Sequence, residues 1–155
     1  MNVIELKVKR LPHCRDLPRY ATPGSAGMDL TAAIDKPLTL EPGKRIGIPT
    51  GIIIEIPVGY EGQVRPRSGL AAKFGLSLTN CVGTIDSDYR GEVVALIINH
   101  GDGPYTFEPG ERIAQLLITP VPRVEVVEVD EVSDTKERGA GGFGSTGKSM
   151  LTASK

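Results

Sequence analysis

A glycine-rich stretch near the C-terminus has the residue types and spacing of a phosphate-binding loop. From Gly142 to Ser149 the chain matches the pattern G-x-x-x-x-G-K-[ST], in which backbone N–H groups and the start of a helix cradle phosphates. Such a loop follows a buried strand, but residues 133–138 include no apolar side chain. Only seven residues follow Lys148, too few for a stable helix. We therefore interpret the match as coincidental and do not expect a P-loop nucleotidase core.

The same tail still has features that suit a phosphorylated ligand. Its glycines let the backbone approach a ligand closely and expose consecutive N–H groups. Arg138 adds a planar guanidinium that fits phosphate oxygens, and Phe143 offers a ring on which a base can stack. The alternative is a disordered Gly/Ser tail without a ligand. At this point both interpretations stay open.

Length and composition exclude several functional classes. The 155 residues suffice for one well-packed domain, and a net charge of -1 argues against general nucleic-acid binding. Cys14 and Cys81 form no CxxC pair and there are only two histidines, so neither a disulfide framework nor a zinc site is expected. No basic leader and no long apolar run follow Met1. We therefore expect a cytoplasmic protein without a membrane partner.

Short apolar runs separated by glycine and proline predict a fold made mostly of short strands. The 19 glycines and 12 prolines mark turns between the runs. The one helix expected is short, residues 68–74, and Gly75 ends it. Near-regular strand spacing favours a β-sandwich or jelly roll. The expected strands are 4–8, 45–48, 51–56, 60–65, 92–99, 112–119 and 124–129.

The chain divides into a strand-rich body and a polar C-terminal part. Apolar density falls from Asp130 onward, so we expect a domain over residues 1–130, an arm over 131–147 and a disordered tail over 148–155. An arm that cannot bury a core of its own becomes ordered only by docking on a ligand or a neighbouring subunit.

Two polar segments in the first half of the body are candidates for binding an anion or a metal. Asp29 follows small residues at the start of a strand, where it serves either as a turn cap or as a water-mediated contact to Mg²⁺. Arg67, Ser68 and Gly69 enter the short helix, where amides, a hydroxyl and a guanidinium form an anion site. Ser68 also suits a plain N-cap, and the two roles are compatible.

Two further segments lie in the second half of the body. Residues 80–91 read as a hairpin whose backbone can recognise the edge of a base. Asp86 and Asp88 in this segment either have a catalytic role or stabilise the turn through their side chains. Gln115 interrupts an apolar strand, and a buried Gln needs partners, so it is either a core hydrogen-bonding device or a ligand contact.

Together these segments resemble the five ordered motifs of the trimeric dUTP nucleotidohydrolases (dUTPases). The resemblance runs from about residue 3 to residue 147, in the family's order and spacing. Any one motif is weak evidence, whereas five in register are specific. The resemblance implies an all-β jelly-roll subunit, a distorted β-barrel with one short helix, in a homotrimer with a glycine-rich C-terminal arm. The motifs are 26–30 (AGMDL), 66–69 (PRSG), 83–91 (GTIDSDYRG), 112–116 (RIAQL) and 138–147 (RGAGGFGSTG).

The resemblance implies hydrolysis of dUTP to dUMP and pyrophosphate, which keeps uracil out of DNA and supplies dUMP for dTMP synthesis. Asp86 is expected to activate the water that attacks the α-phosphorus. Tyr89 is expected to pack on the deoxyribose and to exclude a 2′-hydroxyl. Asn80 and the backbone of Gly83, Thr84 and Ile85 are expected to read uracil.

The remaining motif residues are expected around the triphosphate. The second and fourth motifs imply phosphate contacts from Arg67, Ser68, Gly69 and Gln115. Mg²⁺ is expected to ride mainly on the triphosphate, with Asp29 as an outer-shell partner through water. In the arm, the resemblance implies base stacking by Phe143 and γ-phosphate contacts from Arg138, Gly144, Ser145 and Thr146. Active sites shared between subunits are expected.

Three other functions are alternatives to dUTP hydrolysis. A related jelly-roll enzyme, a dCTP deaminase or a bifunctional form, would release ammonia from dCTP. A trimeric binding or regulatory module would keep the fold without catalysis, although the intact Asp86 and arm argue against this. A P-loop ATPase is the most distant alternative.

Overall fold

The computed structural model describes residues 3–135 and 139–142. These residues fall into two compact units, one ending at Arg123 and one beginning at Val124. The first unit contains eleven strands and one helix. In the second unit, the described residues form no helix or strand. The expected end of the body at residue 130 stays a prediction.

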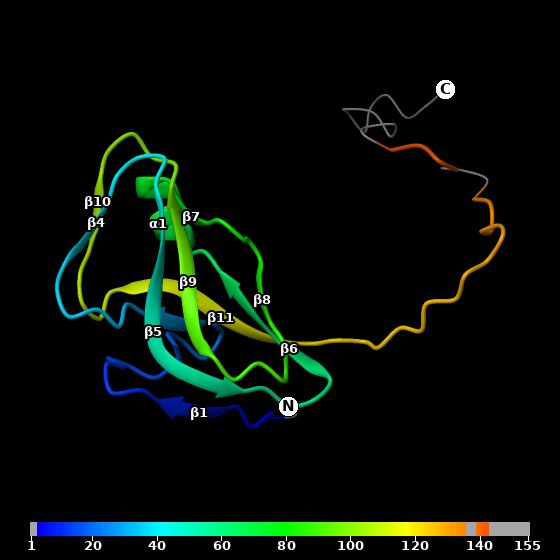
Figure 1. Cartoon of the computed structure of the whole chain (residues 1–155), viewed down its shortest axis with the longest axis horizontal. Helices are drawn as coiled ribbons and strands as arrows, with labels where there is room; N and C mark the ends of the chain where they lie inside the picture. Colours follow the sequence, from blue (N-terminus) through cyan, green and yellow to red (C-terminus); the bar gives the residue numbers. More distant parts are fainter. Residues whose placement is uncertain (1–2, 136–138, 143–155) are drawn as a thin grey trace. The chain divides into compact units, whose positions relative to one another are not determined.

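Two antiparallel sheets and a small ribbon form the first unit (Figure 1). One sheet has the strand order β1-β5-β9-β7, and the other has the order β2-β3-β11-β6-β8. Strands β10 and β4 form the ribbon. The bounds are β1 Lys7–Arg10, β2 Arg19–Tyr20, β3 Met28–Thr31, β4 Leu38–Leu40, β5 Arg45–Glu55, β6 Tyr60–Arg65, α1 Ser68–Phe74, β7 Leu76–Leu78, β8 Gly83–Ile85, β9 Glu92–Asn99, β10 Tyr105–Phe107 and β11 Arg112–Pro120.

The core lies between the two sheets and draws side chains from both. Ile54 on β5 and Ile97 on β9 are buried from one side, and Leu30 on β3 and Leu116 on β11 from the other. Side chains alternate between buried and exposed along β9, as expected for a strand with one face on a core. This arrangement confirms the all-β jelly-roll expectation.

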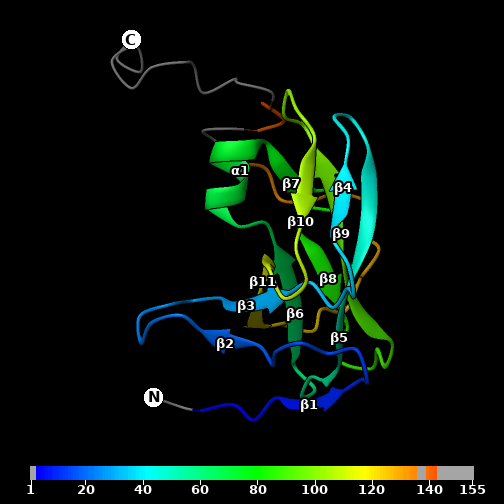
Figure 2. The ribbon, with the colours of Figure 1, turned by 90° about the vertical axis from the view of Figure 1, so that its left-hand side faces the viewer.

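The helix matches its sequence prediction, and Figure 2 shows it at one end of the first unit. Gly75 adopts the left-handed conformation with φ of 69°, and its N–H donates to the carbonyl of Ala71. Glycine reaches this conformation without the steric cost of a Cβ atom. Seven residues cannot cross a bilayer, and no described helix has the length and hydropathy to do so.

Three strand predictions need correction. The strand expected over residues 4–8 is displaced toward the C-terminus, because β1 runs Lys7–Arg10. Residues 45–48 and 51–56 were expected as separate strands, but β5 runs unbroken from Arg45 to Glu55. Its pairing with β9 shifts register between Pro49 and Ile53, so a bulge absorbs the proline that would otherwise end the strand. The strand expected over residues 124–129 is wrong. Those residues pair with none of the described strands. Alternation of apolar and polar residues does not produce a strand unless a neighbouring strand is present to pair with it.

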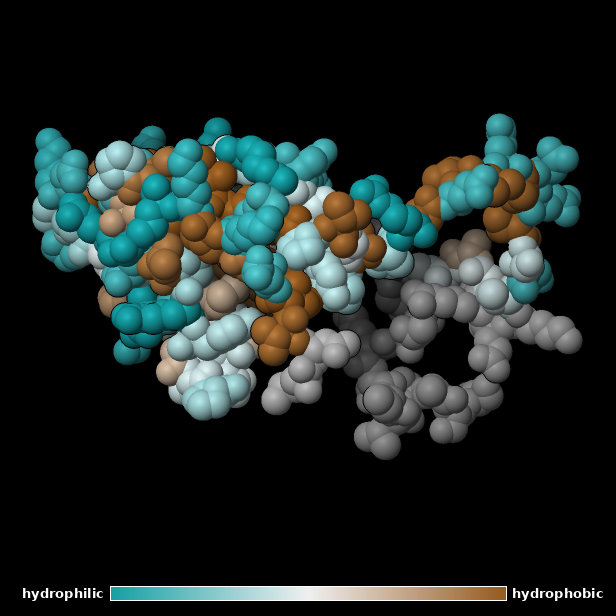
Figure 3. Space-filling model, turned by 90° about the horizontal axis from the view of Figure 1, so that it is seen from below, coloured by the Kyte–Doolittle hydropathy of each residue, from teal (hydrophilic) through white to brown (hydrophobic). Residues whose placement is uncertain are grey.

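The surface of this fold mixes hydrophilic and hydrophobic residues, as Figure 3 shows for one face. Val82 and Tyr89, in the loops flanking β8, are partly exposed. Val94 and Leu96 on β9 are exposed to 40% and 41%. Both lie on the solvent side of an otherwise core-facing strand, which marks this part of β9 as a candidate contact surface.

Three aromatic side chains hold α1 against the ribbon. The ring of Tyr105 lies 4.8 Å from the ring of Phe74 on α1 and 4.8 Å from that of Phe107. The Tyr105 hydroxyl donates to Glu111 Oε1, and Glu111 Oε2 accepts the N–H of Glu108 at 2.9 Å. Burial, followed by the hydrogen bond to Glu111, raises the pKa of Tyr105 to about 12.

We predict that Tyr105 stabilises the folded protein at neutral pH and that this contribution to the free energy of unfolding is lost in alkali. Its neutral form is favoured in the folded state, so the unfolded chain loses this proton first as pH rises. The contribution is fully present below about pH 10, the usual Tyr pKa, and is lost as pH approaches about 12. Denaturant unfolding of wild type and Tyr105→Phe across this range should give curves that converge as pH rises. A constant difference between the two would contradict the assignment.

Candidate functional site

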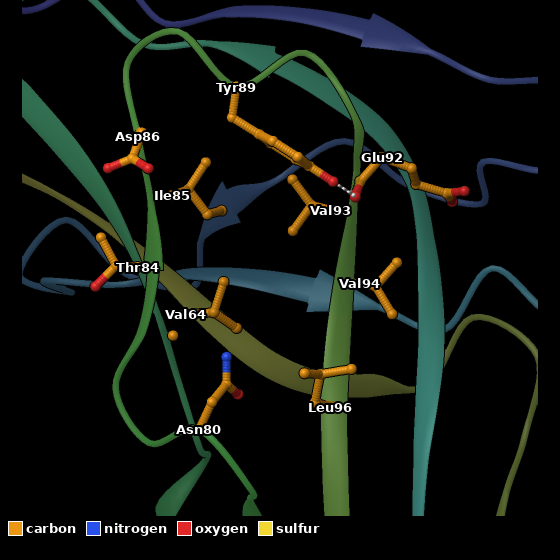
Figure 4. A pocket seen from close by; sticks show the side chains of 11 residues that line it. Val64, Asn80, Thr84, Ile85, Asp86, Tyr89, Glu92, Val93, Val94 and Leu96 are labelled. Carbon is orange, nitrogen blue, oxygen red and sulfur yellow. Dashed lines mark hydrogen bonds between the residues drawn. The ribbon is translucent and has the colours of Figure 1, made fainter.

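A pocket of about 250 Å³ opens between β8 and β9 (Figure 4). One side is formed by β8 and the loops at its two ends, and the other by the first half of β9. Six of the eleven lining residues are those that sequence analysis assigned to uracil, the sugar or the attacking water. They are Asn80, Gly83, Thr84, Ile85, Asp86 and Tyr89.

The pocket exists because consecutive strands enter different sheets. The hairpin expected over residues 80–91 is wrong, because β8 pairs with β6 whereas β9 pairs with β5 and β7. Gly62 on β6 lies opposite Ile85, and a Cβ atom there would lie 3.2 Å from Ile85 Cβ and 2.9 Å from Ile56 Cδ1. Its missing side chain lets β8 sit close to β6. The separation of β8 from β9 leaves the opening.

Strand β8 has the properties of a base-reading edge. It is the last strand of its sheet, so one backbone edge has no neighbouring strand among the described residues. Unpaired N–H and C=O groups on such an edge are available to a ligand. The amide of Asn80 lies beside the strand, since a Cβ atom on Gly83 would be 3.1 Å from Asn80 Nδ2. Glycine at position 83 keeps this approach open.

A short turn carries Asp86 and Tyr89 from β8 toward β9. The N–H of Tyr89 donates to the carbonyl of Asp86 at 3.1 Å, and Figure 4 shows the Tyr89 side chain reaching toward Glu92. The Tyr89 hydroxyl donates to the Glu92 carbonyl at 3.2 Å. A Cβ atom on Gly91 would lie 2.2 Å from the Tyr89 hydroxyl oxygen, so the ring occupies space that only glycine leaves free. The turn and Gly91 therefore fix one wall of the pocket.

Asp86 is exposed and lines a second pocket as well. That pocket, of about 310 Å³, also includes Glu61, Asp88 and Arg123. Asp86 therefore lies at the boundary of the two spaces. A carboxylate in this position is accessible to water and to a ligand that extends out of the first pocket.

The other predicted contacts form a separate cluster around Asp29. Its carboxylate lies 3.2 Å from Arg67 Nε and 3.1 Å from Arg112 Nη1. Arg67 Nη1 also donates to the Arg112 carbonyl at 3.0 Å. Asp29 is on a strand and not in a turn, so the turn-cap interpretation is wrong. The two guanidiniums are held side by side by one carboxylate, an arrangement that presents positive charge to an anion.

Strand register brings Gln115 into this cluster. It lies opposite Asp29 on β3 and opposite Arg65 on β6, because β11 pairs with both strands. Its Nε2 donates to the Pro66 carbonyl at 2.9 Å. A Cβ atom on Gly27 would lie 2.4 Å from Gln115 Oε1, so the small residue leaves room for the amide. Gln115 thus ties the entrance of α1 to the central strand.

Ser68 and Gly69 are exposed in the first turn of α1. The N-cap is Arg67, and no side chain caps the helix. The prediction of Ser68 as N-cap is therefore wrong, because the residue lies one position inside the helix. Its hydroxyl is not used in capping and is accessible to a ligand.

In a single chain, these two groups of residues do not form one pocket. The pocket beside β8 contains none of Asp29, Arg67, Ser68, Gly69 and Gln115. The predicted arm contacts lie outside the described residues. These are Arg138, Phe143, Gly144, Ser145 and Thr146.

Sequence reasoning missed two parts of the site. Arg112 was read only as the start of a motif, yet it pairs with Asp29. The β9 wall, with Glu92, Val94 and Leu96, was read as an ordinary core strand. The signal for this wall was present, because Val94 and Leu96 are apolar residues at the alternating positions that should face solvent.

The described residues offer no protein cage for a metal ion. Among them, no group of three or more His, Cys, Asp or Glu side chains is placed to hold one. Asp29 has both oxygens engaged by arginines. Such a carboxylate suits a contact through water better than direct coordination.

The fold and this pocket define a jelly-roll protein with a small-ligand site between its sheets, and comparison with known proteins identifies its family. The family model for dUTPase matches residues 15–147. Deoxyuridine 5′-triphosphate nucleotidohydrolase of Rhizobium rhizogenes is 60% identical over 92% of this chain and 93% of its own. The enzyme of that name from Aquifex aeolicus is 64% identical over 81% and 85%.

Solved structures agree with the sequence comparisons. Staphylococcus bacteriophage 80alpha dUTPase with dUpNHpp has a TM-score of 0.84 at 32% identity, covering 94% of this chain and all of the other. A mutant dUTPase from phage phi11 of S. aureus, described with a structural Mg(II) ion, has a TM-score of 0.74 at 28% identity, covering 83% and 98%. The chain belongs to the dUTPase family, and its activity is that of a dUTP diphosphatase.

We predict that Gly91→Ala weakens binding of a deoxyuridine nucleotide. The new methyl group would lie 2.2 Å from the Tyr89 hydroxyl oxygen, so the ring must leave its position. We expect about a tenfold rise in the Kd of dUMP by calorimetry, which corresponds to a loss of about 1.4 kcal/mol of binding free energy.

Gly24→Ala is the matched control, since a Cβ atom there meets nothing within 4 Å. It should bind dUMP like wild type. Equal affinity of the Gly91 and Gly24 variants would show that the Tyr89 ring does not form a wall of the nucleotide site.

Proposed function

We propose that the chain hydrolyses dUTP to dUMP and pyrophosphate with Mg²⁺, using a water activated by Asp86 to attack the α-phosphorus. The observation that carries this is the position of Asp86, directly after the base-reading edge of β8 and at the outer boundary of its pocket. A nucleotide with its base on β8 extends its phosphates out past this carboxylate. Asp86 can then orient a water and accept its proton.

Base selection rests on hydrogen bonds to an edge. Uracil presents two carbonyls and one N–H, and the backbone of Gly83, Thr84 and Ile85 with the amide of Asn80 can match them. Cytosine carries an amino group where uracil has a carbonyl, so it leaves buried polar groups unpaired, which discriminates strongly. The methyl group of thymine would be refused by its fit against β8.

Sugar selection rests on the Tyr89 wall. The ring packs against the deoxyribose and leaves no room for a 2′-hydroxyl. Its contact with Gly91 and its hydrogen bond to the Glu92 carbonyl support this, because both restrict the ring's movement. A rigid wall excludes a ribonucleotide better than a mobile one.

The phosphates are bound by the cluster around Asp29 and by the arm. Arg67, Ser68, Gly69 and Gln115 contact the phosphate chain. Two adjacent guanidiniums and an uncommitted Ser68 hydroxyl support this role. By resemblance, Phe143 stacks on uracil, and Arg138, Gly144, Ser145 and Thr146 hold the γ-phosphate.

Mg²⁺ is bound mainly by the triphosphate, with Asp29 in contact through water. When bound, it neutralises substrate charge and stabilises the leaving pyrophosphate.

The complete site is formed between subunits of a homotrimer. The division of the predicted contacts into two groups supports this, because the nucleoside pocket of one chain lacks its phosphate ligands. Neighbouring subunits would supply the second group and the arm. We place the enzyme in the cytoplasm, where its reaction keeps uracil out of DNA and supplies dUMP for dTMP synthesis.

We predict that Asp86→Asn lowers kcat by about 100- to 10,000-fold, the usual contribution of a general base. Asparagine keeps the shape but cannot accept the proton, so the Kd of a non-hydrolysable dUTP analogue should change little. Pyrophosphate release with dUTP, UTP, dCTP and dTTP measures turnover and selectivity. Chelation of Mg²⁺ should suppress turnover of wild type.

Asp88→Asn is the matched control, an aspartate of the same turn that lines only the second pocket. It should keep nearly full turnover. Hydrolysis in ¹⁸O-water should place the label in dUMP. Full activity of Asp86→Asn would remove it as the base, and label in pyrophosphate would exclude attack at the α-phosphorus.

A further inference from the structure

The Glu92 side chain hydrogen-bonds to two segments, the loop that contains His13 and the part of β5 that contains Gly51. Its Oε1 accepts the N–H of Gly51 at 2.8 Å and a hydrogen bond from His13 Nε2 at 2.7 Å. The Glu92 side chain is 25% exposed. Hydrogen bonds to a carboxylate are short and strong, particularly where water has limited access.

Both partners of this carboxylate are held in place by their own contacts. Gly51 lies in the bulge of β5, where its carbonyl accepts the N–H of Leu11 at 2.8 Å. Gly51 has φ of 72°, and a Cβ atom on it would lie 2.4 Å from Cys14 Cα. The loop that carries His13 is therefore packed directly on the bulge. Thr50 donates to the Val93 carbonyl at 2.6 Å and ties the same bulge to β9.

The main chain of Glu92 contacts the nucleotide pocket. Its carbonyl accepts the Tyr89 hydroxyl at 3.2 Å, and Figure 4 shows the carboxylate pointing away from Tyr89 while the carbonyl faces it. Glu92 is also the first residue of β9. The side chain of Glu92 thus binds the His13 loop and the β5 bulge, and its backbone carbonyl binds Tyr89. One residue therefore connects these two segments to the Tyr89 wall.

We propose that Glu92 and His13 are positioning residues for sugar selection. They fix the start of β9 so that its carbonyl holds the Tyr89 ring where a 2′-hydroxyl cannot fit. Neither residue touches the substrate, and the proposal rests on the role proposed for Tyr89. The hydrogen bond between Glu92 and His13 does not involve Asp86. We therefore expect its loss to change the preference for dUTP over UTP.

The test is the ratio of kcat/KM for dUTP to that for UTP. Glu92→Ala removes the acceptor and should lower this ratio by about tenfold or more, since a wall displaced by about 1 Å can cost up to about 100-fold. His13→Ala should lower it in the same direction. Glu92→Gln keeps an oxygen that can accept both hydrogen bonds and should restore selectivity. A purely structural role would lower stability without changing the ratio.

Asp35→Ala is the matched control. Asp35 pairs with Arg15 at 2.8 Å and so secures the same loop from its other side, without any contact to Glu92. Its loss should leave the dUTP to UTP ratio unchanged. A control that lowers the ratio as much as Glu92→Ala would overturn the proposal, because general loosening of the loop would then explain both.

Variants of Tyr89 separate this proposal from the function on which it rests. Tyr89→Ala should abolish sugar selection; if it does not, the role proposed for Tyr89 is wrong. Tyr89→Phe keeps the ring but loses the bond to the Glu92 carbonyl, so adding Glu92→Ala should lower the ratio little further. If Tyr89→Ala loses selectivity while Glu92→Ala and His13→Ala keep it, only the positioning role is overturned. Should Glu92→Ala fail to fold, His13→Ala alone decides in the same way.

Discussion

The site depends on the pairing of β8 with β6 and not with its sequence neighbour β9. This pairing places β8 at the edge of one sheet while β9 remains inside the other. The space between them becomes a pocket, and β8, an edge strand with unpaired backbone groups, forms one side of it. Backbone N–H and C=O groups cannot move independently as side chains do. If β8 binds the base as proposed, this surface is already organised before the ligand arrives.

Glycines leave room for neighbouring groups at three points around the pocket. Gly62 allows β8 to approach β6, Gly83 leaves room for Asn80, and Gly91 leaves room for the Tyr89 ring. In each case the space is taken by a group that lines the pocket or supports it. The cluster around Asp29 is organised differently, by ion pairs among Asp29, Arg67 and Arg112. In the function we propose, rigid packing selects the nucleoside and charge attracts the phosphates.

The sequence predicted the local features well because each has a local cause. Gly75 ends α1 through its own backbone conformation, and the predicted residues of segment 80–89 line one pocket because they are close in the chain. Features that depend on distant partners were missed. The pairing of β8 with β6, the Asp29–Arg112 ion pair across 83 positions, and the β5 bulge all require knowledge of which strands meet. Alternation over residues 124–129 predicted a strand, but a strand also needs a neighbour.

Amide NMR with dUMP tests most directly whether β8 reads the base. In a ¹⁵N-labelled sample, saturating dUMP should shift the amides of Gly83, Thr84 and Ile85. Hydrogen exchange should slow for those of the three whose N–H faces the unpaired edge of β8, since the others already face β6. Amides of Thr39 and Thr106 in the separate β4–β10 ribbon should stay unchanged. Nucleotide binding that leaves the β8 amides unaffected would contradict the account, since the base would then be bound elsewhere.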